Sequence, residues 1–176
     1  MDHLGDPHLL GGYPPILPGV LLALVLALAL HRAVARRLAI GRFHAWFLAA
    51  CAGTILAITL TPSRWALELG AHGPATCDLS RLGPASLAVY LRFDDPMLNV
   101  LMFIPLGVVI GLVGDGRRRL GLAIAAAALP VAIELTQAVV VPLGRACQGG
   151  DLFDNVAGLA IGRALGTTLG VLARLA

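Results

Sequence analysis

Five long apolar stretches dominate the chain, and short polar connections separate most of them. Each stretch comes close to the ~20 residues with which an α-helix crosses the ~30 Å hydrocarbon core of a bilayer. They cover residues 16–30, 43–61, 97–113, 120–143 and 152–175. The first is the shortest, but it follows no basic segment and has prolines around its start, so it is not typical of a signal peptide. The pattern predicts an all-α fold, a membrane helix bundle of about five transmembrane helices.

The composition supports a membrane protein. Of the 176 residues 58% are hydrophobic and 13% are charged, whereas soluble domains contain ~25% charged residues. The length and the absence of a polar linker favour a single domain over residues 1–176. The net charge of +3 does not indicate nucleic-acid binding, because the arginines form short clusters beside apolar stretches. Membrane lipids are the partners that this composition indicates.

The arginine clusters predict an orientation. Short connections rich in arginine stay on the cytoplasmic side of a membrane. We therefore expect the N-terminus outside, the C-terminus inside, and the connection over residues 62–96 outside, where its length indicates ordered structure. A short interfacial helix is expected over residues 86–93, with Trp65 and Tyr90 as anchors at the headgroup level. The clusters contain Arg32, Arg36, Arg37 and Arg42 in the first connection and Arg117, Arg118 and Arg119 in the third.

Two of the three cysteines fall in different outer connections. Cys77 and Cys147 would face the oxidising side of the membrane, where disulfides persist, while Cys51 lies within the second helix. One hypothesis is a Cys77–Cys147 disulfide. The alternative is two unpaired thiols, because the sequence does not show whether the two Cα atoms come close enough for a bond.

Polar residues gather near the outer ends of the last three helices. An ionisable residue within a bilayer costs ~2.5–3.5 kcal/mol on insertion scales, so Glu134 requires a partner, a proton or water. We expect the polar residues to line one cavity that opens outward. The alternative is that the amides form hydrogen bonds between helices and hold the bundle together. The candidates are Asn99, Glu134, Gln137, Arg145, Asp151, Asp154 and Asn155.

These residue types suit proton transfer and phosphate binding. Carboxyl groups act as general acids and bases, and the planar fork of arginine matches phosphate oxygens. Asp151 and Asp154 are also candidate oxygen ligands for a divalent cation such as Ca²⁺ or Mg²⁺, whereas the histidines lack zinc-ligand spacing.

On the fifth helix, Gly158, Gly162, Gly166 and Gly170 form a ridge typical of close helix packing. We interpret this ridge and Arg163 as structural.

Three motifs occur in order along residues 94–162. They are N-x-x-x-F-x-P-x-G from Asn99 to Gly107, E-x-x-Q from Glu134 to Gln137, and Arg145 followed by D-x-x-D-N-x-x-G from Asp151 to Gly158. This arrangement resembles the VanZ-like family. The resemblance implies a multi-pass protein of the bacterial cell membrane with a role in resistance to the glycopeptide teicoplanin. It also implies, by analogy, kinship with membrane enzymes that act on phospholipid or lipid-linked cell-wall head groups.

Three functions follow as hypotheses. The first is an enzyme at the outer leaflet, a hydrolase or transferase of lipid head-group phosphodiesters. In it Glu134 is the general acid or base, Arg145 contacts phosphate, and Asp151 with Asp154 forms a second acid or a metal site. Asn99, Gln137 and Asn155 then orient these groups.

The second hypothesis is a non-enzymatic membrane adaptor whose polar cluster is structural. The third is a small transporter, although no internal repeat supports it.

Overall fold

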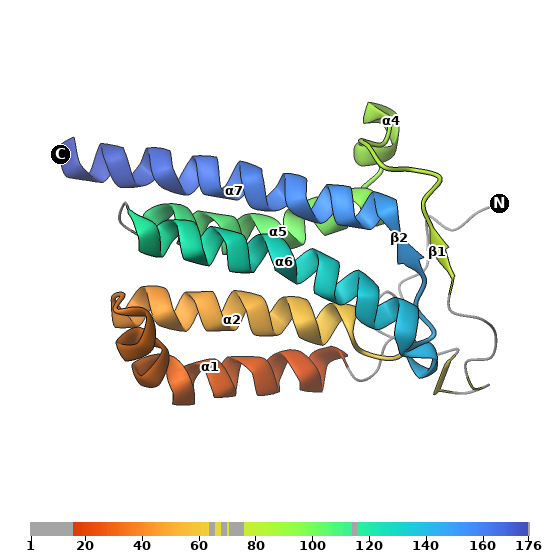
Figure 1. Ribbon diagram of the computed structural model, residues 1–176, viewed down its shortest axis with the longest axis horizontal. Coiled ribbons are helices and arrows are strands. Elements are labelled where there is room, and N and C mark those ends of the chain that lie inside the picture. The colour runs from red at the N-terminus through yellow and green to blue at the C-terminus, as the bar shows by residue number, and fades with distance from the viewer. Residues whose placement is uncertain (1–15, 64–65, 68–69, 71–75, 114–115, 176) are drawn as a thin grey trace.

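The computed structural model describes residues 16–63, 66–67, 70, 76–113 and 116–175. In this part of the chain, five helices are long and apolar enough to cross a membrane (Figure 1). The predicted all-α membrane bundle is therefore confirmed, while Trp65 lies outside the described residues. The helices are α1 (Ile16–Leu38), α2 (Arg42–Thr59), α5 (Asp95–Leu112), α6 (Arg117–Val139) and α7 (Gly149–Leu175).

The helix ends differ from the apolar stretches for identifiable reasons. Helix α1 continues beyond residue 30 to Leu38, because the alanines, leucines and arginines that follow are all strong helix formers. Helix α5 begins at Asp95 with Pro96 in its first turn, where the missing N–H of proline costs nothing. Helix α6 ends at Val139, and a 3-10 turn, η1 (Val141–Leu143), follows it around Pro142, which cannot continue an α-helix.

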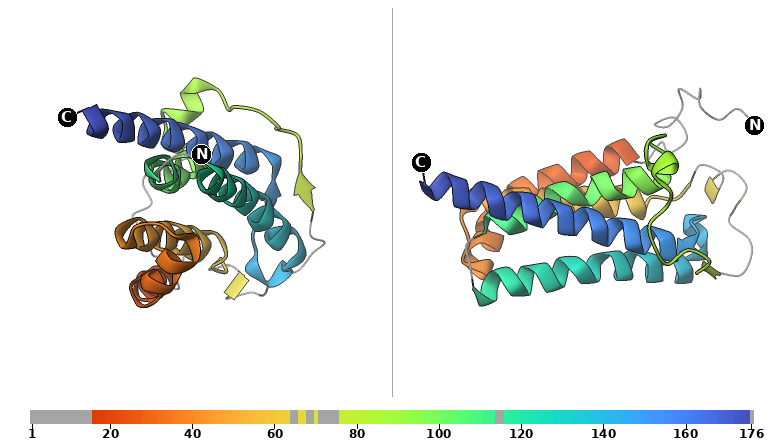
Figure 2. Two further views of the ribbon diagram at one scale, coloured as in Figure 1. Left: turned by 60° about the vertical axis from the view of Figure 1, so that its left-hand side comes forward. Right: turned by 90° about the horizontal axis from the view of Figure 1, so that it is seen from above.

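The helices form two closely packed pairs. Helices α1 and α2 make an antiparallel hairpin, whereas α5 and α7 run side by side in the same direction. Helix α6 returns the chain from the end of α5 to the start of α7 (Figure 2). Ile55 of α2, Phe103 of α5 and Ile133 of α6 meet in the buried core. This core joins the α1–α2 hairpin to the other three helices.

Glycines on both helices make the α5–α7 contact unusually close. A Cβ atom added to Gly158, Gly162 or Gly166 would lie 2.1–2.2 Å from a backbone carbonyl oxygen of α5. A Cβ atom on Gly107 would lie 2.3 Å from the backbone oxygen of Leu159 in return. The ridge therefore serves packing over its first three glycines. A Cβ atom at Gly170 would meet only a side chain at 4.0 Å.

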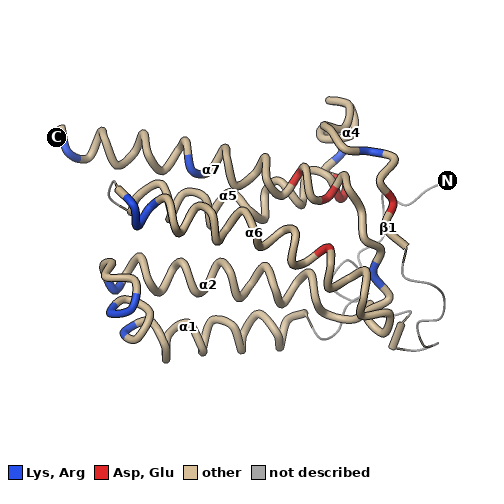
Figure 3. The backbone as a smooth tube through the Cα atoms, viewed as in Figure 1, with Lys and Arg blue, Asp and Glu red and all other residues tan. Residues whose placement is uncertain are grey.

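Charged residues divide the bundle into two ends (Figure 3). Arginines gather at the α1–α2 turn, at the start of α6 and at the end of α7; we call this the arginine end. The acidic residues that the structure describes lie toward the opposite, carboxylate end. There the connection over residues 62–96, which we call the outer connection after its expected side, contains the strand β1 (Cys77–Asp78) and the short helix α4 (Leu87–Tyr90), within the stretch expected to be helical. The charge separation agrees with the predicted topology, and its direction across the cell membrane stays a prediction.

Adding one methyl group at Gly162 should weaken the bundle. In Gly162→Ala, the new Cβ atom meets the backbone oxygen of Ile104 at 2.1 Å, so α5 and α7 must separate, at a cost of about 1–3 kcal/mol. The matched variant Gly170→Ala adds the same group where there is room, and should be neutral or gain up to ~1 kcal/mol from helix propensity. Unfolding by sodium dodecyl sulfate in mixed micelles measures both. Equal stability of the two variants would contradict the packing role.

Candidate functional site

The parallel arrangement of α5 and α7 places the starts of both helices at the carboxylate end. Asp95 and Asn99 of α5 consequently lie near Asp151 in the first turn of α7. The amide of Asn99 is a hydrogen-bond partner of the Asp151 carboxylate, and Asp95 and Arg81 are close enough to interact with it electrostatically. Residues far apart in the sequence thus surround the first turn of α7.

Asp154 anchors the outer connection to α7. Its side chain is fully buried, and its Oδ2 atom lies 2.7 Å from the Nη2 atom of Arg81. The hydroxyl of Tyr90 donates a hydrogen bond of 2.5 Å to the other oxygen, Oδ1. Both carboxylate oxygens are therefore held by the connection, and the expected role of Asp154 as an acid or metal ligand stays a prediction. Tyr90, expected as an interfacial anchor, also binds this carboxylate.

Arg81 is a residue that the sequence motifs missed. Its Nη1 atom donates to the backbone oxygen of Gly83 at 2.8 Å, which turns the connection around the guanidinium group. The hydrogen bond with Asp154 raises the pKa of Arg81, so the group keeps its positive charge. A Cβ atom on Gly150 would lie 2.2 Å from Nη2 of Arg81. The paired glycines at the start of α7 were the one sequence sign of this approach.

Gln137 and Arg145 both bind the last turn of α2. The Nε2 atom of Gln137 donates to the backbone oxygen of Thr59 at 3.0 Å. Arg145 donates from Nε to the oxygen of Thr61 at 3.1 Å and from Nη2 to that of Ile58 at 2.8 Å. The final carbonyls of a helix lack partners within the helix, and a cation is favourable there. Gln137 thus bonds between helices, as the structural alternative expected. Arg145 binds the end of a helix, and its expected contact with phosphate stays a prediction.

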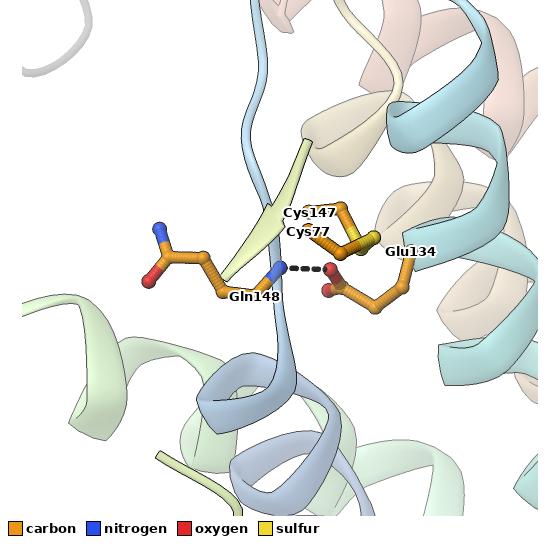
Figure 4. Close-up of a disulfide and its surroundings, with 4 residues drawn as sticks. All are labelled: Cys77, Glu134, Cys147 and Gln148. Atoms are coloured by element: carbon orange, nitrogen blue, oxygen red, sulfur yellow. Dashed lines mark hydrogen bonds between the residues drawn. A yellow bond between two sulfur atoms is a disulfide. The ribbon is translucent and has the colours of Figure 1, made fainter. Parts of the chain in front are cut away.

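A disulfide joins the two outer connections, as hypothesised. Cys77 and Cys147 are bonded, with their Cα atoms 4.5 Å apart. They are directly paired in a parallel two-stranded sheet of β1 and β2 (Cys147–Gln148). The backbone N–H of Gln148 donates to the Oε2 atom of Glu134 at 2.7 Å, as Figure 4 shows. The disulfide therefore fixes the backbone group that orients the carboxyl group of Glu134.

Among the candidate carboxyl groups, Asp154 forms an ion pair with a described residue, whereas Glu134 and Asp151 do not. Glu134 is 7% exposed and lies close enough to Asp151 for their charges to interact. Asn155 is buried beside Asp154 in α7, and its Oδ1 atom has no hydrogen-bond partner among the described residues. Of the seven residues expected at one site, Asp154, Gln137 and Arg145 hold the fold together. The other four, Asn99, Glu134, Asp151 and Asn155, belong to α5, α6 and α7.

Comparison with known proteins agrees with this architecture. The model of the VanZ/LLP1 family matches residues 20–170. The chain belongs to the VanZ/LLP1 family. The match extends over all five helices, beyond the motifs in residues 94–162 that first indicated the relationship. No curated protein and no solved structure matches the chain.

The geometry of this VanZ/LLP1 protein does not favour the metal site expected at Asp151 and Asp154. Within the described residues, no group of three or more His, Cys, Asp or Glu side chains is close enough to hold a metal ion. The oxygens of Asp154 are already bonded to Arg81 and Tyr90. Calcium takes six to eight oxygen ligands and magnesium six. A divalent cation would therefore need most of its ligands from a substrate or from water.

Removing the disulfide should loosen the carboxylate end. The bond closes a loop of 70 residues, so chain entropy alone predicts a loss of about 4 kcal/mol in Cys77→Ser with Cys147→Ser. The mass of the intact protein without reductant checks that the bond is present, and unfolding in detergent measures the loss. Cys51→Ser, which changes the free cysteine, is the control. A stability loss no larger than that of the control would contradict this role.

Replacing Arg81 should release the outer connection. Arg81→Gln leaves the fully buried Asp154 carboxylate without its cation, and we expect a loss of about 1.5–3 kcal/mol. Limited proteolysis should then cut the connection between β1 and α4 faster than in the parent protein. Arg92→Gln removes the same charge from an exposed position in that connection and should change neither measurement. Equal proteolysis of both variants would argue against the anchor.

Proposed function

We propose that this VanZ/LLP1 protein binds and acts on the head group of a phospholipid or a lipid-linked envelope component at the outer leaflet. The observation that carries the proposal is the approach of two carboxyl groups, Glu134 of α6 and Asp151 of α7, which lie close enough for their charges to interact, with the cationic Arg81 near Asp151. All three lie at the end of the bundle, where the head groups of a bilayer begin. A phosphodiester within a head group needs a cation for its oxygens and an acid or base for its leaving or attacking group.

Each residue then has a role that fits its surroundings. Glu134 is the general acid or base, because the N–H of Gln148 fixes the orientation of its buried side chain. Asp151, oriented by Asn99, is the second carboxyl group. Arg81 takes the role of phosphate contact that the sequence suggested for Arg145. Its side chain is 31% exposed, so its charge is accessible from the outer side, and arginine binds phosphate through directed hydrogen bonds.

The family relationship connects this chemistry to antibiotic resistance. A protein that alters or shields envelope lipids at the outer surface would change how a glycopeptide such as teicoplanin reaches its target. We therefore propose a contribution to teicoplanin resistance in a bacterial cell membrane, with the head-group activity as its cause.

A non-enzymatic adaptor is the second candidate, and a specific observation favours it. Asp154, Gln137 and Arg145 all bind parts of the fold, as they would in a protein whose polar residues serve packing alone. In that case the outer connection is the functional surface. The charge of Glu134 would then be dispensable.

The variant Glu134→Gln separates the two candidates. Glutamine keeps the shape of the side chain and can still accept the N–H of Gln148, but it cannot transfer a proton. We expect an activity loss of about 10²–10⁴-fold, seen as the lipid profile and teicoplanin susceptibility of cells that lack the protein. Asp78→Asn removes an exposed carboxylate of the same outer connection and should preserve both.

The contrary outcome is also defined. An unchanged lipid profile and unchanged susceptibility in Glu134→Gln would rule out the enzymatic proposal. If deletion of residues 79–93 then abolished the effect on susceptibility, the adaptor would be the better account.

A further inference from the structure

Three neighbouring cavities lie along α1 and α2 toward the arginine end, away from the candidate site. The first is an apolar cavity of about 640 Å³ between α1, α2 and α5, lined by residues such as Leu24 and Met102. The second has a volume of about 400 Å³, and Trp46 lines both it and the first. The third, of about 500 Å³, shares Arg42 with the second. We call this row of three cavities the α1–α2 groove.

The polarity of the groove changes in one direction. Its first cavity contains no charged residue, whereas the last is lined by Arg32, Arg36 and Arg42. None of the residues lining the three cavities is acidic. In the part of the chain that the structure describes, these three arginines form no ion pair. The α1–α2 groove thus combines an apolar cavity with a cluster of positive charges that have no ion-pair partner among the described residues.

We propose that the α1–α2 groove binds one anionic phospholipid from the leaflet at the arginine end. An acyl chain fits the apolar cavity, whose volume lies within the ~300–1,000 Å³ typical of ligand sites. The phosphate lies among Arg32, Arg36 and Arg42, because guanidinium groups match phosphate oxygens and basic pockets at helix ends bind lipid head groups.

Trp46 lies where the glycerol ester groups of such a lipid would be. It lines the junction between the apolar cavity and the cavity that contains Arg42. Its indole N–H is buried and has no acceptor among the described residues, whereas buried tryptophan usually finds one. The proposal assigns the ester carbonyl of the bound lipid to this N–H as its acceptor.

The alternatives account for less of the structure. Arginines that only orient the protein in the membrane do not require an apolar cavity that leads to them. A second copy of this chain, related by twofold symmetry, would place its own arginines against these arginines, and like charges repel. An anionic lipid matches both the charge and the apolar part.

Quenching of Trp46 fluorescence tests the proposal directly. The full chain contains two tryptophans, so Trp65→Phe leaves Trp46 as the only emitter. This protein is reconstituted into phosphatidylcholine bilayers that contain increasing fractions of phosphatidylglycerol with brominated acyl chains, which quench indole fluorescence on contact. Brominated phosphatidylcholine is the comparison lipid. We expect half-maximal quenching at a mole fraction roughly tenfold lower for phosphatidylglycerol, because each arginine near the head group favours the anionic lipid.

Two variants and their controls identify the groove as the binding site. Arg36→Gln with Arg42→Gln should abolish the preference for phosphatidylglycerol, whereas Arg117→Gln with Arg119→Gln removes equal charge at the same end and should retain it. Thr54→Phe fills the apolar cavity without changing the charge that orients the protein, and should also abolish the preference. Its control, Thr168→Phe, adds the same ring at an exposed position on α7.

Several outcomes would overturn the proposal. Equal quenching by both lipids would show only the general lipid layer around the protein. A preference that survives in both groove variants would place the anionic lipid elsewhere. Weak quenching by either lipid, together with a dimer trapped by cross-linking, would identify a second copy as the occupant. None of these outcomes bears on Glu134, which lies at the opposite end.

Discussion

The close parallel contact of α5 and α7 is the constraint on which the rest of this structure depends. Gly107 on one helix and Gly158, Gly162 and Gly166 on the other leave no room for a single added carbon atom. This contact fixes the register of the two helices, so Asn99 and Asp151 reach the same place. Two parallel neighbours also require a returning helix between them, and α6 brings Glu134 back to that end as it does so. The carboxyl cluster is therefore a consequence of the packing of glycines along the whole pair.

The polar residues at this end solve a problem that lipid imposes on every helix bundle. Backbone carbonyls at a helix end find no water in the hydrocarbon region, so other protein groups must bind them. Gln137 and Arg145 do this for Thr59 and Ile58 in the last turn of α2. Asp154 holds the outer connection in place through Arg81 and Tyr90, because this connection has little secondary structure of its own. Motif residues thus divide into those that complete the fold and those that remain for chemistry.

The sequence predicted the helices well, since apolar length is a local property. The predicted helix over residues 16–30 was too short, because arginines interrupt the apolar stretch there but are themselves good helix formers, so α1 continues to Leu38. The spacing of the glycines predicted a tight contact, although not its partner. The sequence did not show which polar residues hold the fold together and which stay available for chemistry. These roles depend on pairs such as Arg81 and Asp154, which are 73 positions apart. Arg81 belongs to no motif. Gly150, which lacks a side chain where Arg81 approaches α7, is the one sequence sign of this contact.

Helix α2 connects the two regions to which we assign lipid contacts. Near its start, Arg42 and Trp46 line the α1–α2 groove, and at its other end Thr59 accepts the hydrogen bond from Gln137. Gln137 lies one turn of α6 from Glu134, so the position of α2 and the position of the candidate acid or base are mechanically related. Packed helices shift as rigid units more readily than they deform. An occupant that steadies α2 at the arginine end would therefore also steady the end of α6 that carries Glu134.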